Sequence, residues 1–193
     1  MNQFIHYFIL FIIVICILIS YNSLHSELVS VNSTVDNQKY SVRNLPDKQK
    51  AADLLARIRK KINLIVATLN EKFPNDTRVK RLTKNLKNIK ISELISTSNF
   101  TSYSLNKGEK IVFCIRNKKT QKLININTLM FVAIHELAHV MTIDIGHTPK
   151  FWANMKFILQ VAIDANIYKK QDFEKKPEPY CGIMITSSPL DDD

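Results

Sequence analysis

Hydrophobic residues are spread unevenly along this chain, with a nearly unbroken apolar run close to its beginning and periodic patterns farther on. Residues 4–19 are almost wholly apolar on every face of a helix, and extension to Tyr21 gives about the minimum length of a membrane span. A cleaved signal peptide is the alternative, but no Lys or Arg precedes Lys39, and the residues after the run match a cleavage site poorly. The pattern predicts an uncleaved transmembrane anchor over residues 1–21.

The charges and sequons that follow this run bear on its orientation. Its nearest basic residues, beginning with Lys39 and Arg43, lie on the C-terminal side, which favours a cytosolic C-terminal domain. N-x-S/T sequons at Asn32, Asn75 and Asn99 are the opposing signal, but an Asn-rich chain contains several by chance. We therefore expect a single-pass membrane protein whose larger part faces the cytosol.

The next segments differ in their periodicity. Residues 22–45 are rich in Ser, Asn, Thr and Val without a clear period, which is typical of a linker. Asp47 can then cap a helix whose apolar positions recur over residues 51–69, and a proline separates this helix from a second one over residues 79–89. Residues 46–97 are therefore predicted to be a helical segment.

The period changes to that of strands after residue 97. Residues 101–105 and 111–115 predict two strands around a turn at Lys107–Gly108, and Leu123–Ile124 predicts a short third strand. The stretch Lys110–Arg116 can be an edge strand to which an extended peptide adds, or an ordinary core strand.

The most informative stretch is a group of histidines in an otherwise apolar helix. His135, Glu136 and His139 form an H-E-x-x-H pattern, and His147 follows eight residues later. Residues four apart lie one turn above each other on a helix, so His135 and His139 can present two imidazoles to one ion. Glu136 lies beside them, within reach of a bound water. Because catalytic zinc takes three protein ligands and keeps one open position, His147 is the predicted third ligand.

Local signals also fix the direction of this third ligand. Asn127–Thr128 is predicted to cap the metal-binding helix, and Gly146 can end it. Thr148–Pro149 is a typical N-cap and first residue of a following helix, so His147 would be held between a helix end and a helix start. On that second helix, Trp152 is predicted to pack in the core behind the metal-binding helix rather than to contact substrate.

Other residues could complete the site differently. Asp144 and Glu174 are weaker candidates for the third ligand, because the first lies very close to the helix end and the second lies a helix away. The phenol of Tyr180 could stabilise the oxyanion of a tetrahedral intermediate, although packing is its commoner role. Cys114 and Cys181 could pair, but nothing in their spacing indicates it, so both are predicted to be free thiols.

The positive charge of the chain is concentrated in one segment. The formal net charge is +10, and residues 46–90 contain thirteen Lys and Arg against four Asp and Glu, a net of +9. Such a basic helical segment could bind nucleic acid or an anionic lipid surface, or could be a solvated face of a Lys-rich protein. With three glycines, the chain has no Gly-rich phosphate-binding loop.

The sequence His-Glu-Leu-Ala-His at 135–139, followed by Gly-His at 146–147 and Phe-Trp at 151–152, resembles the zincin signature of the WLM and SprT-like metallopeptidases. The chain also resembles uncharacterised metallopeptidase-like proteins of large DNA viruses. The specific match covers about residues 128–155, with a looser similarity over residues 102–189.

This resemblance implies an α+β fold with a zincin-like domain over residues 98–193, in which a short antiparallel sheet packs on the H-E-x-x-H helix and a following helix. It implies that His135, His139 and His147 hold zinc and that Glu136 is the catalytic base. Members of these families act on proteins attached to DNA, so it also implies a protein or peptide substrate.

We therefore predict a membrane-anchored, zinc-dependent metallopeptidase in which Glu136 acts as general base on a zinc-activated water. The alternative is a non-catalytic, zinc-stabilised binding module tethered to a membrane or to nucleic acid. Glu136 argues against this alternative, because a structural zinc site needs no base at that position.

Overall fold

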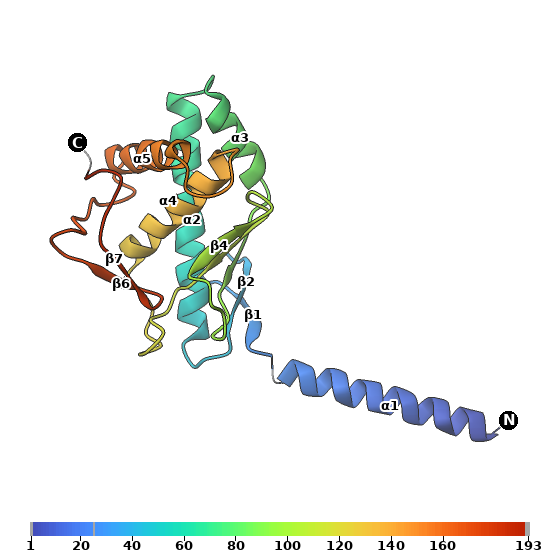
Figure 1. Ribbon diagram of the computed structural model, residues 1–193. Coiled ribbons are helices and arrows are strands. Elements are labelled where there is room, and N and C mark those ends of the chain that lie inside the picture. Colours follow the sequence, from blue (N-terminus) through green and yellow to red (C-terminus); the bar gives the residue numbers. More distant parts are fainter. Residues whose placement is uncertain (1, 25, 192–193) are drawn as a thin grey trace.

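The computed structural model describes residues 2–24 and 26–191 of the chain. Over these residues the protein has an α+β fold with five helices, a five-stranded mixed sheet and a separate two-stranded hairpin. Figure 1 shows helices α2 to α5 gathered beside the sheet, while α1 extends away from them.

Helix α1 (Asn2–Leu24) contains the apolar run near the start of the chain. Across the residues that the structure describes, no helix combines the length and the apolar character needed to cross a membrane. The predicted transmembrane anchor over residues 1–21 and the predicted single-pass membrane localisation are therefore wrong.

The main sheet contains five strands in the order β1-β2-β3-β5-β4. These strands are β1 (Leu28–Asn32), β2 (Lys39–Arg43), β3 (Lys90–Glu93), β4 (Ser102–Leu105) and β5 (Lys110–Phe113). The pairs β1–β2 and β4–β5 are antiparallel, whereas β3 runs parallel to both β2 and β5. The β4–β5 hairpin was predicted and is confirmed, but the sheet is mixed rather than antiparallel.

The β1–β2 hairpin occupies most of the stretch that was predicted to be a linker, residues 22–45. In β2, Tyr40 and Val42 are 1% and 0% exposed, while Lys39 and Ser41 face solvent, as in a strand with one buried face. Two buried residues are too few for the sequence pattern to indicate a strand. Pairing with β1 and β3 therefore determines that this segment is a strand. The linker prediction is wrong for this hairpin.

The basic segment forms the two predicted helices, α2 (Lys48–Lys72) and α3 (Thr77–Leu86). Their periodic apolar residues, including Ile58, Ile62 and Leu82, are fully buried. Asp47 occupies the N-cap position of α2, but its side chain does not cap the helix. Its carboxylate instead accepts a hydrogen bond from Nη1 of Arg116 at 2.7 Å.

Part of the positive charge on these helices is used inside the fold. Nη1 of Arg78 donates to Oδ1 of Asn154 at 3.1 Å, and Nη1 of Arg81 donates to the carbonyl oxygen of Met141 at 2.8 Å. Both contacts reach the helix pair that carries the histidines. Binding of nucleic acid or anionic lipid by the remaining basic residues of 46–90 stays a prediction.

Helix α4 (Ile126–Met141) lies at the centre of the fold, in contact with α2, α3, α5 (Pro149–Asp164) and β4. The edge of the sheet beside it is β4, because β5 is enclosed between β4 and β3. Of the two alternatives for Lys110–Arg116, the edge strand is therefore wrong and the core strand is confirmed for β5. The neighbour that encloses it is β3, which was expected to be part of a helical segment.

The hairpin of β6 (Glu178–Tyr180) and β7 (Ile183–Ile185) follows α5 and is joined covalently to the main sheet. Cys114, directly after β5, forms a disulfide with Cys181 in the β6–β7 turn, and their Cα atoms lie 6.0 Å apart. The prediction of two free thiols is wrong, because folding brings together two residues that are 67 positions apart.

Candidate metal centre

The histidine face is the part of α4 that the hydrophobic core leaves accessible. Most of the other side chains of this helix are buried, but His135 and His139 are only partly buried and stand one turn apart. The side-chain oxygen of Asn125 caps the helix by accepting a hydrogen bond from the N–H of Asn127 at 2.7 Å. The cap therefore lies two residues before the predicted cap at Asn127–Thr128.

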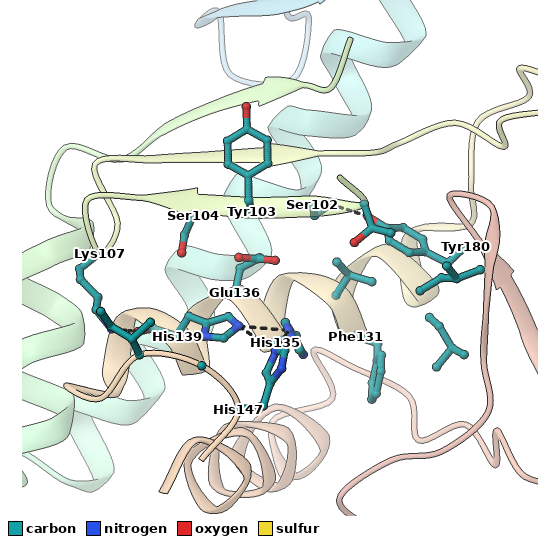
Figure 2. A pocket seen from close by; sticks show the side chains of 16 residues that line it. Ser102, Tyr103, Ser104, Lys107, Phe131, His135, Glu136, His139, His147 and Tyr180 are labelled. Carbon is teal, nitrogen blue, oxygen red and sulfur yellow. Dashed lines mark hydrogen bonds between the residues drawn. The ribbon is translucent and has the colours of Figure 1, made fainter. Parts of the chain in front are cut away.

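Three imidazoles converge at one point in front of α4 (Figure 2). The Nε2 atom of His135 lies 3.2 Å from that of His139 and 3.1 Å from that of His147, and the Nε2 atoms of His139 and His147 are 3.1 Å apart. Nitrogens bound tetrahedrally to one zinc ion would be about 3.3 Å apart. The spacing therefore fits a single divalent cation, and this is the one such group of possible ligands among the described residues.

His147 is delivered by the loop between α4 and α5. Helix α4 ends at Met141 rather than at Gly146, which turns the loop with φ of +85°. Glycine adopts this left-handed conformation without a steric penalty. Thr148 then caps α5, its Oγ1 accepting from the N–H of Phe151, and Pro149 is the first helical residue, as predicted.

Aromatic rings support the imidazoles from the α5 side. Phe151 is 0% exposed, and its ring centroid lies 4.3 to 4.8 Å from those of all three histidines. Trp152 is 44% exposed and stacks on His147, with 5.5 Å between ring centroids. The prediction that Trp152 packs in the core is wrong, since adjacent helical residues point about 100° apart and Phe151 takes the inward position.

Lys107, in the β4–β5 turn, holds the end of α4 and the loop that carries His147. Its Nζ donates to the carbonyl oxygens of His139 at 3.3 Å, Thr142 at 2.9 Å and Asp144 at 3.1 Å. The last carbonyls of a helix lack helical partners and carry partial negative charge, so a cation stabilises them. Lys107 was predicted only to lie in a turn, because no local pattern indicates its contact with residues more than 30 positions away.

Burial favours the neutral form of two histidines. Together with smaller contributions from the neighbouring His139 and His147, it lowers the pKa of His135 to about 3. Burial also lowers the pKa of His139 to about 4, with smaller contributions from His147 and Lys107. A neutral imidazole keeps the lone pair that a metal ion requires, so the protonation state of the site fits metal binding.

Glu136 lies beside the imidazoles in the wall of a cavity of about 500 Å³. Its side chain is buried, at 4% exposure, and Figure 2 shows it between Ser104 of β4 and the histidines. Burial raises the pKa of Glu136 to about 7, while hydrogen bonds with Ser104 oppose this rise. The cavity thus brings together three imidazoles, one carboxyl group and the edge strand β4.

The weaker candidates for the third ligand lie outside this group. The Asp144 carboxylate is 3.4 Å from Nζ of Lys150, and Glu174 is exposed on the surface. Tyr180 is 2% exposed, which confirms the packing interpretation, and its hydroxyl lies 2.5 Å from Oγ of Ser102 in the cavity wall. A role for Tyr180 in stabilising an oxyanion stays a prediction.

Known proteins are similar to this chain in sequence. Residues 33–187 match the model of the WLM domain. The chain is 36% identical over 164 residues to an uncharacterized protein of Acanthamoeba polyphaga mimivirus, with 83% of each chain covered. It is 42% identical over 84 residues to an uncharacterized protein of Invertebrate iridescent virus 3, covering 42% of this chain and 50% of that relative.

Solved structures of Wss1 are also similar. Wss1 from Saccharomyces cerevisiae has 17% sequence identity and a TM-score of 0.48, covering 65% of this chain and 89% of that chain. A Wss1 mutant from S. pombe has 21% identity and a TM-score of 0.43, covering 63% and 92%. Because the family model matches most of its length, and the mimivirus relative aligns over a similar share, this chain belongs to the WLM domain family, the metallopeptidase family that its histidine motif resembles.

Proposed function

We propose that this protein is a zinc-dependent metallopeptidase that hydrolyses peptide bonds in protein or peptide substrates. The observation that carries the proposal is the convergence of the Nε2 atoms of His135, His139 and His147, within 3.2 Å of one another, next to the buried carboxyl group of Glu136. Membership of the WLM domain family supports the same assignment.

The openness of the site favours catalysis over a structural role. Structural zinc sites are closed by four protein ligands, whereas catalytic sites use three and leave one position for water or substrate. Here three imidazoles face a cavity, and the side chain of His147 is exposed. No cysteine or carboxylate joins the three histidines within the described residues.

The side chains around the ion would have separate roles in proton transfer and in positioning. A zinc ion held by the three histidines would supply a Lewis acid and would make a water molecule more acidic. Glu136 would accept the proton of the attacking water and then donate it to the amine that leaves. Ser104 would hold the Glu136 carboxyl group in place through its hydrogen bonds. The aromatic ring of Phe151 would fix the orientation of the imidazoles from behind.

Strand β4 is the candidate binding surface for the backbone of the substrate. It ends the sheet, so one side of it has no partner strand, and three of its residues, Ser102 to Ser104, line the cavity. An extended peptide can pair with such an edge through main-chain hydrogen bonds that do not depend on its sequence. This arrangement would place a peptide bond of the added strand beside Glu136 and the histidines.

The test is a comparison of the wild-type protein with Glu136→Gln. We expect the variant to keep one zinc per chain, measured by elemental analysis, and to lose at least about 100-fold in the rate of casein hydrolysis, because the proton acceptor is absent. Glu109→Gln, at an exposed glutamate in the β4–β5 turn, is the matched control and should retain both properties. Equal hydrolysis by the wild type and Glu136→Gln would remove Glu136 from the mechanism.

A further inference from the structure

The β6–β7 hairpin forms one wall of the cavity but holds none of the three histidines. Tyr180, Ile183 and Ile185 of this hairpin line the cavity, together with residues of α4, β4 and the α4–α5 loop. Figure 2 shows Phe131 and Tyr180 on the side of the site opposite Lys107. Lys107 therefore lies toward one end of the cavity, Glu136 and the histidines lie between, and this hairpin bounds the other end.

Two specific links hold the hairpin in place. The disulfide between Cys114 and Cys181 joins its turn to the end of β5. The hydroxyl groups of Tyr180 and Ser102 lie 2.5 Å apart and connect it to β4. Its outer strand contributes little to the core, since Ile183 and Met184 are each 53% exposed. The hairpin is thus fixed at its turn, while the side chains of β7 remain accessible.

Apart from the hydroxyl groups of Tyr180 and Ser102, which contact each other, the hairpin end of the cavity is lined by apolar side chains. Phe131 and Val132 form the α4 side, and Ile183 and Ile185 form the hairpin side. A further apolar side chain of the cavity lining, Ile145 of the α4–α5 loop, is 90% exposed. The charged residues that line the cavity are Lys107 and Glu136, besides the histidines. Exposed apolar side chains around a concave site indicate a ligand that covers them.

Resting on the proposed peptidase function, we propose that the disulfide-anchored β6–β7 hairpin is the specificity element of the enzyme. It would select substrates with a large apolar side chain, such as Leu or Phe, next to the cleaved bond. That side chain would be buried between Phe131 of α4 and Ile183 and Ile185 of β7. A serine or aspartate at the same position would leave the apolar walls exposed or would lose its own hydration.

The experiment uses the zinc-loaded full chain and a set of otherwise identical peptides that vary the residues flanking the cleaved bond among Leu, Phe, Ser and Asp. We expect kcat/KM for the Leu or Phe peptides to exceed that for the Ser peptide by about 10- to 100-fold, the usual effect of burying one large apolar side chain. The double substitution Ile183→Ser and Ile185→Ser should reduce this ratio by about 10-fold. Met184→Ser, on the same strand but outside the cavity lining, should leave it unchanged.

Binding provides a second readout that does not require hydrolysis. The Glu136→Gln protein should bind the Leu and Phe peptides more tightly than the Ser and Asp peptides, as measured by calorimetry. Adding the Ile183→Ser and Ile185→Ser substitutions to this protein should reduce the difference in affinity. If the wild-type enzyme cleaves all four peptides equally well, the specificity inference is overturned while the peptidase function stands. If no peptide is cleaved but the binding preference persists, the peptidase function is overturned instead.

The disulfide is tested separately with the double variant Cys114→Ser and Cys181→Ser, which keeps every residue that lines the cavity. Loosening of the hairpin should lower the preference for Leu and Phe while the zinc content stays at one per chain. An unchanged preference in this variant would contradict the role of the disulfide. An equal loss of preference in Met184→Ser and the β7 double variant would contradict the role of the cavity-facing side chains.

Discussion

The helix pair α4–α5 and the five-stranded sheet face each other across the cavity, and different kinds of contact assemble them (Figure 2). The three imidazoles and Glu136 all come from residues 135–147, so two helices and one loop place them. The sheet instead joins distant segments, as where Oε2 of Glu93 in β3 accepts a hydrogen bond from the N–H of Arg43 in β2, 50 positions away. Because the ligand group is local and the sheet contacts are long-range, we expect that contacts inside the sheet can be weakened without loss of the metal ligands.

The largest expected effect concerns the helix pair itself. His147→Ala should lose zinc on dialysis, and hydrolysis should fall by at least about 1,000-fold, because a two-histidine site cannot retain the Lewis acid. Asp144→Ala is the matched control, since it removes the rival ligand three positions earlier and should keep both zinc and activity. Elemental analysis and a peptide assay measure the two variants. Zinc retained in His147→Ala but lost in Asp144→Ala would reverse the assignment of the third ligand.

The next effect tests the sheet. Glu93 is 2% exposed, and its Oε1 accepts from Nε of Arg116 at 2.7 Å, where Arg116 is 4% exposed. Glu93→Ala would leave the Arg116 guanidinium buried without this partner, at a cost of about 3–5 kcal/mol in the free energy of unfolding. Urea unfolding measures this loss, and exposed Glu109→Ala is the control.

The zinc content of folded Glu93→Ala protein tests whether the metal ligands of the helix pair depend on the stability of the sheet. We expect it to match that of the wild type, because the ion pair lies outside the cavity. A loss of zinc from the folded variant would show that the two parts are not separable.

Lys107 offers a way to sharpen the comparison, because it belongs to the β4–β5 turn but acts on the end of α4. Lys107→Met keeps much of the aliphatic side chain and removes three hydrogen bonds to backbone carbonyls. We expect zinc affinity to fall by about 10- to 100-fold, as for other residues that orient metal ligands. Competition with a chromophoric chelator measures the affinity, and Lys119→Met in an exposed turn is the control. Equal zinc affinity in the two variants would mean that α5 alone positions His147.

The contrast between local contacts in the helix pair and long-range contacts in the sheet explains how much could be predicted from the sequence. The metal-ligand group depends on a four-residue spacing along one helix and on a helix start at Thr148, and both signals are local. The inward-facing side of α5 was predicted too broadly, because it included Trp152, which is 44% exposed, whereas Phe151 is buried under the imidazoles. Lys107 could not be found, since its contacts depend on the path of the chain between β4 and α4.

The strand order of the sheet was not predicted, because the central strand, β3, contains buried polar residues. In β3, Ser92 and Glu93 are 3% and 2% exposed, so the strand lacks the alternation of apolar inside and polar outside on which recognition depends. Without β3, the partners of β2 and β5 could not be identified, and the edge and core alternatives for β5 could not be separated. The disulfide of Cys114 and Cys181 depends on the same long-range topology, whereas the β4–β5 hairpin was found because its turn is local.

The smallest expected effect lies at the start of α5. Oγ1 of Thr148 accepts from the N–H of Phe151 at 3.4 Å, a long hydrogen bond, so Thr148→Ala should cost about 0.5–1 kcal/mol in the free energy of unfolding. Thr148→Ser keeps the hydroxyl group and serves as the control in urea unfolding. Zinc content should stay at one per chain in both variants, because the ring of Phe151 remains packed under the imidazoles. Loss of zinc from Thr148→Ala would show that this cap orients His147 and does more than begin a helix.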